Sequence, residues 1–122
     1  VIYCAQPGIA LLYSDGNIEI GENLNVISTS IVSSGTVIGD NVTLDAACIG
    51  AKSIIENDVS ISKSVIYAGS HLACATSVKD SIVGEECALD SGVALSEHTL
   101  IGANQKIATN SQLRAQRIPS VV

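Results

Sequence analysis

The sequence has 122 residues, a formal net charge of −6 and 47% hydrophobic residues, which fits one domain or a part of one. The acidic balance argues against nucleic acid or an anionic membrane as the main partner, and no apolar run approaches the roughly 18 residues of a membrane span. Phe, Trp and Met are all absent, so the composition favours a narrow interior filled by Val, Ile and Leu over a conventional globular core.

The first 17 residues differ from the rest of the chain. The segments VIYCA and GIALLY predict two short strands around the turn signal Gln6-Pro7-Gly8. We expect residues 1–17 to cap the fold that follows, or to be the remnant of a preceding domain. The chain begins with Val1 instead of Met, as expected of an excised domain or a trimmed chain.

A repeat of 17 residues runs from Val32 to Thr99. Each row of the repeat divides into segments of six, six and five residues, and every segment opens with an aliphatic residue. The opening residues form three columns: Val32, Ile49, Ile66 and Val83; Ile38, Ile55, Leu72 and Leu89; Leu44, Ile61, Val78 and Leu95. Self-similarity at a short fixed period is typical of solenoids, whose stacked repeats share a continuous core.

The repeat predicts an all-β solenoid over residues 18–113, a triangular prism of about five to six coils. Three segments complete one coil, and adjacent coils pair as three parallel sheets. We expect the opening residue of a segment, and the small residue four positions later, to point inward. Residues suited to turns are expected at the corners: Gly35, Asp40-Asn41, Asn57-Asp58, Gly69, Glu85-Glu86 and Ser91-Gly92.

The regular frame ends near Thr99. One extra residue, Leu100, shifts the frame, and residues 114–122 are expected to leave the solenoid as a tail. An α/β domain is not favoured, because no stretch between residues 18 and 113 has the apolar spacing of an amphipathic helix.

The four cysteines have no CxxC spacing, so they do not indicate a metal site. We interpret the columns of Cys48 and Cys87 as small, inward-pointing positions, where a free Cys behaves as a small hydrophobic residue. Cys74 is expected at a corner and Cys4 in the irregular N-terminus. This usage indicates reduced thiols and a cytoplasmic protein.

Three segments share one pattern of an aliphatic residue, Gly, two turn residues and a small residue. They are Ile20-Gly21-Glu22-Asn23-Leu24-Asn25, Ile38-Gly39-Asp40-Asn41-Val42-Thr43 and Val83-Gly84-Glu85-Glu86-Cys87-Ala88. The pattern resembles the hexapeptide-repeat family of single-stranded left-handed parallel β-helices. The left hand is implied by this resemblance, since periodicity alone does not choose it.

The later segments point to one branch of that family. Ser77-Val78-Lys79-Asp80-Ser81-Ile82-Val83-Gly84-Glu85 and Thr99-Leu100-Ile101-Gly102-Ala103 resemble the C-terminal β-helix of sugar-1-phosphate nucleotidyltransferases, especially ADP-glucose pyrophosphorylases. The resemblance implies a non-catalytic domain without a cofactor that serves oligomerisation, as a dimer or trimer, and regulation. It also implies an upstream catalytic domain, because the Gly-rich nucleotide loop is not present in this sequence.

An acyl-CoA-dependent acyltransferase is the alternative within the same family, and a structural scaffold subunit is a third reading. Acyl transfer needs a histidine as general base, and His71-Leu72 resembles the His-Leu of bifunctional N-acetylglucosamine-1-phosphate uridyltransferases. Tyr67 and Glu56 are expected near His71 as binding residues. Two histidines do not supply the three zinc ligands of a γ-class carbonic anhydrase, so we predict no metal.

One outward column is more apolar than a solvated face should be: Val37, Ile54, His71 and Ala88. We predict that this column is a subunit interface. His98 is expected to be solvent-exposed at a corner. The chain beyond Glu97 carries Lys106, Arg114 and Arg117 without an acid, which favours a polar cap over a site for an anionic effector.

Overall fold

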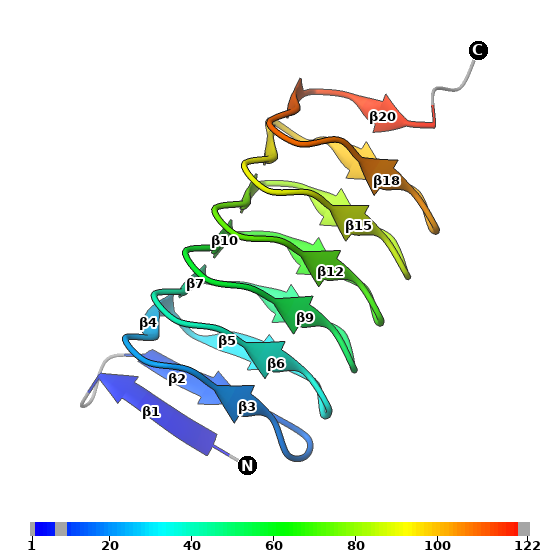
Figure 1. The fold of residues 1–122 in the computed structure, drawn as a ribbon. Coiled ribbons are helices and arrows are strands. Elements are labelled where there is room, and N and C mark those ends of the chain that lie inside the picture. The colour runs from blue at the N-terminus through cyan, green and yellow to red at the C-terminus, as the bar shows by residue number, and fades with distance from the viewer. Residues whose placement is uncertain (1, 7–9, 120–122) are drawn as a thin grey trace.

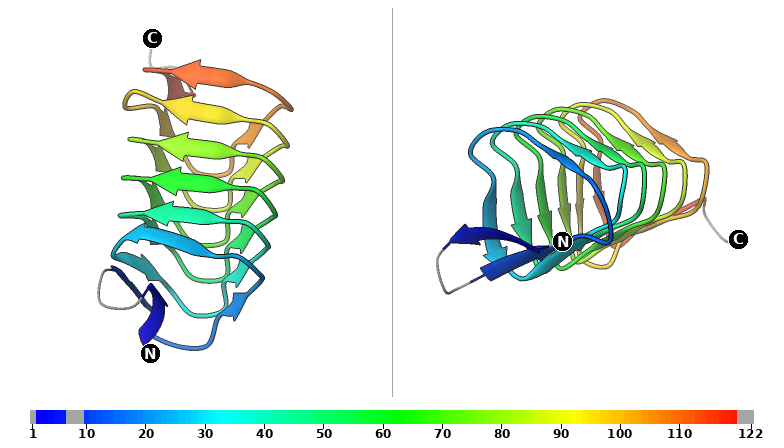
Figure 2. Two further views of the ribbon diagram at one scale, coloured as in Figure 1. Left: turned by 90° about the vertical axis from the view of Figure 1, so that its left-hand side faces the viewer. Right: turned by 90° about the horizontal axis from the view of Figure 1, so that it is seen from below.

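The computed structural model describes residues 2–6 and 10–119, and every regular element within them is a β-strand. The strands stack as a parallel solenoid of about six turns that matches a left-handed β-helix (Figure 1). Two further views show the coils lying one above another, with the first and last strands at opposite ends of the prism (Figure 2). The all-β solenoid predicted from the repeat is therefore confirmed.

Sheet A is the longest of the three sheets. Its strands, in spatial order, are β1 (Ile2–Gln6), β2 (Ala10–Tyr13), β5 (Ser30–Val32), β8 (Cys48–Ile49), β11 (Val65–Ile66), β14 (Ile82–Val83), β17 (Leu100–Ile101) and β20 (Arg117–Ile118). β1 and β2 pair antiparallel, whereas β2 and β5 pair in parallel, so β1 forms the edge of the sheet at the N-terminal end. This pair confirms the two strands expected there, and the turn residues Pro7 and Gly8 lie outside the described residues.

Sheets B and C have six strands each. Sheet B contains β3 (Glu19–Ile20), β6 (Val37–Ile38), β9 (Ile54–Ile55), β12 (His71–Leu72), β15 (Ala88–Leu89) and β18 (Lys106–Ile107). Sheet C contains β4 (Asn25–Ser28), β7 (Thr43–Asp45), β10 (Ser60–Ser62), β13 (Ser77–Lys79), β16 (Ala94–Ser96) and β19 (Gln112–Arg114). Paired residues in the regular coils are 17 positions apart, as Ser60 is from Thr43 and from Ser77.

The three aliphatic columns fill the interior. All twelve opening residues of the four regular rows are at most 2% exposed. Their parallel pairing places aliphatic residues of adjacent coils directly above one another along the prism. The strands of these rows are two or three residues long, and all of them except β5 bury a single residue. The buried core therefore consists mainly of Val, Ile and Leu, in keeping with a sequence that lacks Phe, Trp and Met.

The predicted corners adopt the left-handed backbone conformation. Positive φ angles occur at Gly35, Asn41, Asp58, Gly69, Glu86 and Gly92, which confirms all six expected turns. At Gly69, with φ of +74°, an added Cβ would also lie 2.7 Å from the Glu86 carboxylate in the next coil. Glycine and asparagine suit such corners because their backbones reach this region at low cost.

The inward positions of the third segment were predicted wrongly. Cys48 is exposed and Val65 is half-buried, whereas Ala47 and Ser64 are buried. The third segment has five residues, so its left-handed residue (Ala46 or Lys63) comes one position earlier than in the six-residue segments. The residue immediately after that turn points inward, and the next one, which we had placed inside, points outward.

The extra residue lies in the corner before Thr99 and not at Leu100. Leu100 pairs with Ile82 in regular register, while Glu97 and His98 both have positive φ and form an enlarged corner. Parallel pairing then continues to β20, which lies within the segment 114–122 where we expected a tail.

Buried hydroxyl groups link the coils at the inward positions that are not aliphatic. The Thr36 hydroxyl donates to the carbonyl of Gly50 at 2.9 Å and accepts from the backbone N–H of Ser53 at 3.3 Å. Ser70 makes the equivalent pair of bonds with Gly84 and Cys87 two coils later. These bonds offset the cost of burying polar groups in the narrow core.

Candidate functional site

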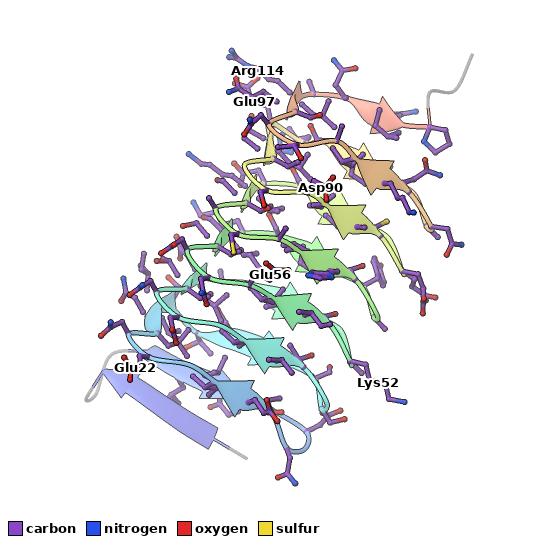
Figure 3. All side chains as sticks on the ribbon, in the orientation of Figure 1. Glu22, Lys52, Glu56, Asp90, Glu97 and Arg114 are labelled. Atoms are coloured by element: carbon purple, nitrogen blue, oxygen red, sulfur yellow. The ribbon has the colours of Figure 1, made fainter. Side chains whose placement is uncertain are left out.

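His71 and Glu56 lie together on sheet B, as the sequence predicted. Glu56 follows β9 (Figure 3). His71 begins β12 in the next coil, and an oxygen of the Glu56 carboxylate contacts Nε2 of His71. The thiol of Cys74 donates to the other carboxylate oxygen at 3.2 Å. Sequence reasoning placed Cys74 at a corner but missed this third contact, which depends on the side-chain conformation of Glu56.

The contacts of Glu56 change the pKa of its own carboxyl and of the Cys74 thiol. The hydrogen bond with His71, followed by that from Cys74, lowers the pKa of the Glu56 carboxyl, against the opposing effect of burial. The Glu56 carboxylate in turn raises the pKa of the Cys74 thiol. A histidine held by a carboxylate has the arrangement of an oriented general base, although all three side chains are partly exposed.

Tyr67 belongs to a different face. It follows β11 of sheet A and is 49% exposed. Together with Ile31 and Cys48 it lines a shallow groove of about 210 Å³ over that sheet. The structure therefore groups Tyr67 with sheet A, while Glu56 and His71 belong to sheet B.

The predicted interface column forms one line on the outside of sheet B. Val37, Ile54, His71 and Ala88 pair in register through β6, β9, β12 and β15. Val37 and Ile54 are 38% and 44% exposed. The column is bounded by Glu19 and Lys106 at its two ends, so its apolar part is short.

Sheet A carries a longer apolar line that the sequence analysis missed. Its outward residues in consecutive coils are Tyr13, Ile31, Cys48, Val65, Ile82 and Leu100, and we call them the sheet A strip. Four of its members rank among the exposed large hydrophobic residues. The strip was missed because the Cys48 column had been assigned to the interior. The shorter third segment in the sequence was the signal that could have shown its true orientation.

Sheet C presents a polar face. The residues of its outward column are Asn25, Thr43, Ser60, Ser77, Ala94 and Gln112. The exposed Ile27 lies in β4, where the pairing with β7 is irregular. Apolar side chains are therefore concentrated on two of the three faces.

Charged groups lie at the C-terminal end and along one edge of sheet A. The guanidinium of Arg114 donates to the Glu97 carboxylate one coil earlier, through Nη2 at 2.7 Å and through Nε (Figure 3). Arg114 thus pairs within its own chain. A second groove, of about 450 Å³, is lined by Lys63, Val65, Asp80, Ile82, Leu100 and Arg117, among others. It runs along the corner beside the sheet A strip.

A family model described as the GMPPB C-terminal domain matches residues 15–120. The chain belongs to the GMPPB C-terminal domain family. A comparison with curated protein sequences gave no match.

The GMPPB C-terminal domain is the C-terminal domain of a sugar-1-phosphate nucleotidyltransferase, which confirms the resemblance drawn from residues 77–103. The matched range begins after β2 and contains the strands from β3 to β20. The family match therefore includes β20, which lies within the segment 114–122 predicted as a tail.

Two further observations bear on the chemistry available to this GMPPB C-terminal domain. Within residues 2–6 and 10–119, no group of three His, Cys, Asp or Glu side chains is placed to hold a metal ion. Glu56 contacts His71 through one carboxylate oxygen and Cys74 through the other. The described part of the chain also contains no helix long and apolar enough to cross a membrane.

Proposed function

We propose that this chain is the non-catalytic β-helix domain of a sugar-phosphate nucleotidyltransferase-type protein and that it serves subunit assembly. The observation that supports this most directly is the asymmetry of the three faces. Sheets A and B carry lines of exposed apolar side chains, whereas sheet C is polar. Exposed apolar lines of this kind mark interaction surfaces in soluble proteins.

The assembly is a homo-oligomer, a dimer or a trimer, beside an upstream catalytic domain whose activity the same contacts regulate. The chain itself needs no cofactor for this role. The reduced thiols of Cys48, Cys74 and Cys87, none of which is in a disulfide, are part of the proposal of a cytoplasmic protein. A purely structural scaffold would differ in having no upstream domain with a nucleotide-binding loop, and the reading frame of the parent gene decides between them.

Light scattering of the 122-residue chain tests the assembly role. We expect a mass of two or three chains for the unmodified protein. Ile54→Lys places a charge in the predicted sheet B interface and should shift the mass to smaller species. Ser60→Lys, on the polar face of the same coil, is the matched control and should leave the mass unchanged. A monomeric unmodified chain contradicts the assembly role, and an unchanged mass for Ile54→Lys contradicts the sheet B interface.

The contact between His71 and Glu56 supports a second candidate function. A carboxylate that orients a histidine is suited to general-base catalysis, in which His71 would take the proton of an acceptor amine or hydroxyl and acyl-CoA would be the cosubstrate. Titration calorimetry with acetyl-CoA tests this candidate. Absence of heat at millimolar ligand, or equal heats for the unmodified chain and His71→Asn, rules it out.

A further inference from the structure

We propose that two copies of this chain pack face to face through the sheet A strip, with their solenoid axes antiparallel. The two-fold axis runs along the strand direction, between the coils that carry Val65 and Ile82. This proposal rests on the assembly role and specifies its surface, partner and register. The sheet B column lies outside this contact, so the sheet A dimer should persist in Ile54→Lys, and this outcome distinguishes it from assembly through sheet B.

The first support is the amount of apolar surface. Ile31, Tyr67, Ile82 and Leu100 are 40–52% exposed. With Cys48 and Val65 they expose roughly 400–500 Å² of apolar surface per copy, taking about 200 Å² for a whole large side chain. A typical interface of about 1,600 Å² is a little over half apolar, or about 900 Å² across both partners. Two copies of this face therefore supply the apolar area that a stable dimer needs.

The second support is the charge pattern beside the strip. Lys63 and Asp80 occupy the same corner in adjacent coils and line the same groove. Neither belongs to an ion pair within the described residues, where the pairs are His71 with Glu56 and Arg114 with Glu97. A two-fold axis between their coils brings Lys63 of each copy opposite Asp80 of the other, which forms two equivalent ion pairs at the rim.

The charges also select this register over its neighbours. An axis that passes through the coil of Val65 would bring the two copies of Lys63 together, and an axis through the coil of Ile82 would do the same for Asp80. Like charges in an interface disfavour the arrangement, while complementary charges fix the register. An axis one coil toward the N-terminus would place Lys63 of one copy opposite Ala46 of the other, which leaves Lys63 without a charged partner.

The third support is the shape of the opposite edge of sheet A. The exposed Tyr67 has Gly50 and Gly84 at the equivalent positions of the coils on either side. In the proposed register the ring of Tyr67 in one copy faces Gly84 of the other. The bulky side chain of Tyr67 thus meets a glycine, and the two-fold axis repeats this contact on its other side. Such self-complementarity is required of an isologous interface.

Charge reversal in the 122-residue chain tests the proposal. Lys63→Glu and Asp80→Lys should each raise the dimer dissociation constant by roughly tenfold or more, because each turns two ion pairs into two repulsive contacts. The double variant Lys63→Glu/Asp80→Lys restores opposite charges across the interface and should recover most of the affinity. Analytical ultracentrifugation gives the dissociation constants. Failure of the double variant to recover affinity overturns the proposed register.

A second pair of variants separates this proposal from the assembly role as a whole. Ile82→Lys should dissociate the dimer, and Ser77→Lys on the polar face of the same coil should not. Alkylation of Cys48 gives an independent readout, since this exposed thiol is covered in the dimer and should react faster in Ile82→Lys. If the unmodified chain is monomeric, both proposals fail. If it is oligomeric and Ile82→Lys changes neither the mass nor the Cys48 rate, the sheet A dimer alone is overturned, and an upstream domain becomes the occupant of the strip.

Discussion

The carboxylate of Glu56 bridges two side chains of the next coil, accepting from the Cys74 thiol on one oxygen and contacting Nε2 of His71 with the other. The pKa of the Glu56 carboxyl therefore depends directly on its contacts with His71 and Cys74. His71→Asn removes the group with the largest effect, so the pKa of the Glu56 carboxyl should rise toward its ordinary value. Side-chain carbon chemical shifts followed by NMR against pH measure it. His98→Asn, at a corner two coils away, is the control and should leave this pKa unchanged.

The direction of the Glu56 shift also fixes its effect on stability. Because its pKa is lower in the folded state than in the unfolded chain, the cluster stabilises the fold above the ordinary carboxyl pKa of 4.5. This stabilisation should be lost as the pH falls through the lower folded pKa. Since the groups are partly exposed, the difference in unfolding free energy between the unmodified chain and Glu56→Gln should be small at pH 7 and absent near pH 2. A difference that persists at pH 2 contradicts this explanation.

The Cys74 thiol provides a second test of the same carboxylate. Its pKa is raised chiefly by donation to Glu56, so Glu56→Gln should lower it and increase the thiolate fraction at a given pH. Alkylation of Cys74 should therefore be faster in Glu56→Gln, as measured by peptide mass spectrometry. Cys87 is buried and donates to the carbonyl of Gly102, so its rate is the internal control. Equal rates at Cys74 in both proteins would show that the hydrogen bond does not control its acidity.

The neighbouring isoleucines of β9 allow the stability contributed by an inward residue to be compared with that of an outward residue. Ile55 is 1% exposed and stacks between Ile38 and Leu72, while Ile54 points outward. Ile55→Ala should lower the free energy of unfolding by about 2–5 kcal/mol, because it removes buried methylene groups and leaves a cavity in a narrow interior. Ile54→Ala should cost under about 1 kcal/mol when measured on the monomer by urea denaturation. Similar losses at the two positions would mean that the inward columns do not carry the stability.

The corners offer a stabilising substitution. Ala75 is exposed with φ of +61°, a conformation that disfavours side chains with a Cβ. Ala75→Gly should therefore raise the free energy of unfolding by about 0.5 kcal/mol, the strain relieved less the entropy that glycine loses. Ala73→Gly, two residues earlier and outside the left-handed region, should destabilise instead. Thermal unfolding of both variants decides, and a loss of stability in Ala75→Gly would contradict the assigned backbone strain.

The sequence predicted most of the architecture because periodicity is a property of the chain itself. The aliphatic columns, the corners and the outward position of His71 all follow from the spacing of residues such as Ile38, Ile55 and Leu72. The same spacing led to an error at Cys48, where a five-residue segment moves the turn and reverses the direction of the next side chains. The rule that the residue four positions after every opening residue points inward does not hold for a five-residue segment. For this reason the sequence did not predict the sheet A strip.

The side-chain contacts were less predictable than the columns. That Glu56 and His71 are near each other follows from adjacent coils, but the contact with Cys74 depends on how one carboxylate is oriented. The sequence predicts the frame shift but places it at Leu100, two to three residues after the enlarged corner at Glu97 and His98. Only the pairing of Leu100 with Ile82 shows where the chain absorbs the additional residue.

The pair formed by Arg114 and Glu97 ties the last coil to the one before it, and its removal should loosen the C-terminal end without unfolding the prism. The Arg114 guanidinium lowers the pKa of the Glu97 carboxyl, so the pair contributes above the ordinary pKa of 4.5 and is lost as the pH falls. Both groups are solvent-exposed, and salt should weaken their attraction.

Arg114→Ala should therefore increase amide hydrogen exchange in β19 and β20 at pH 7 and low salt, and much less in 1 M salt. Arg117→Ala, which removes an arginine without an ion pair among the described residues, is the control and should leave β19 unaffected. Equal exchange in β19 for both variants would show that the end of the solenoid is held by its backbone pairing alone.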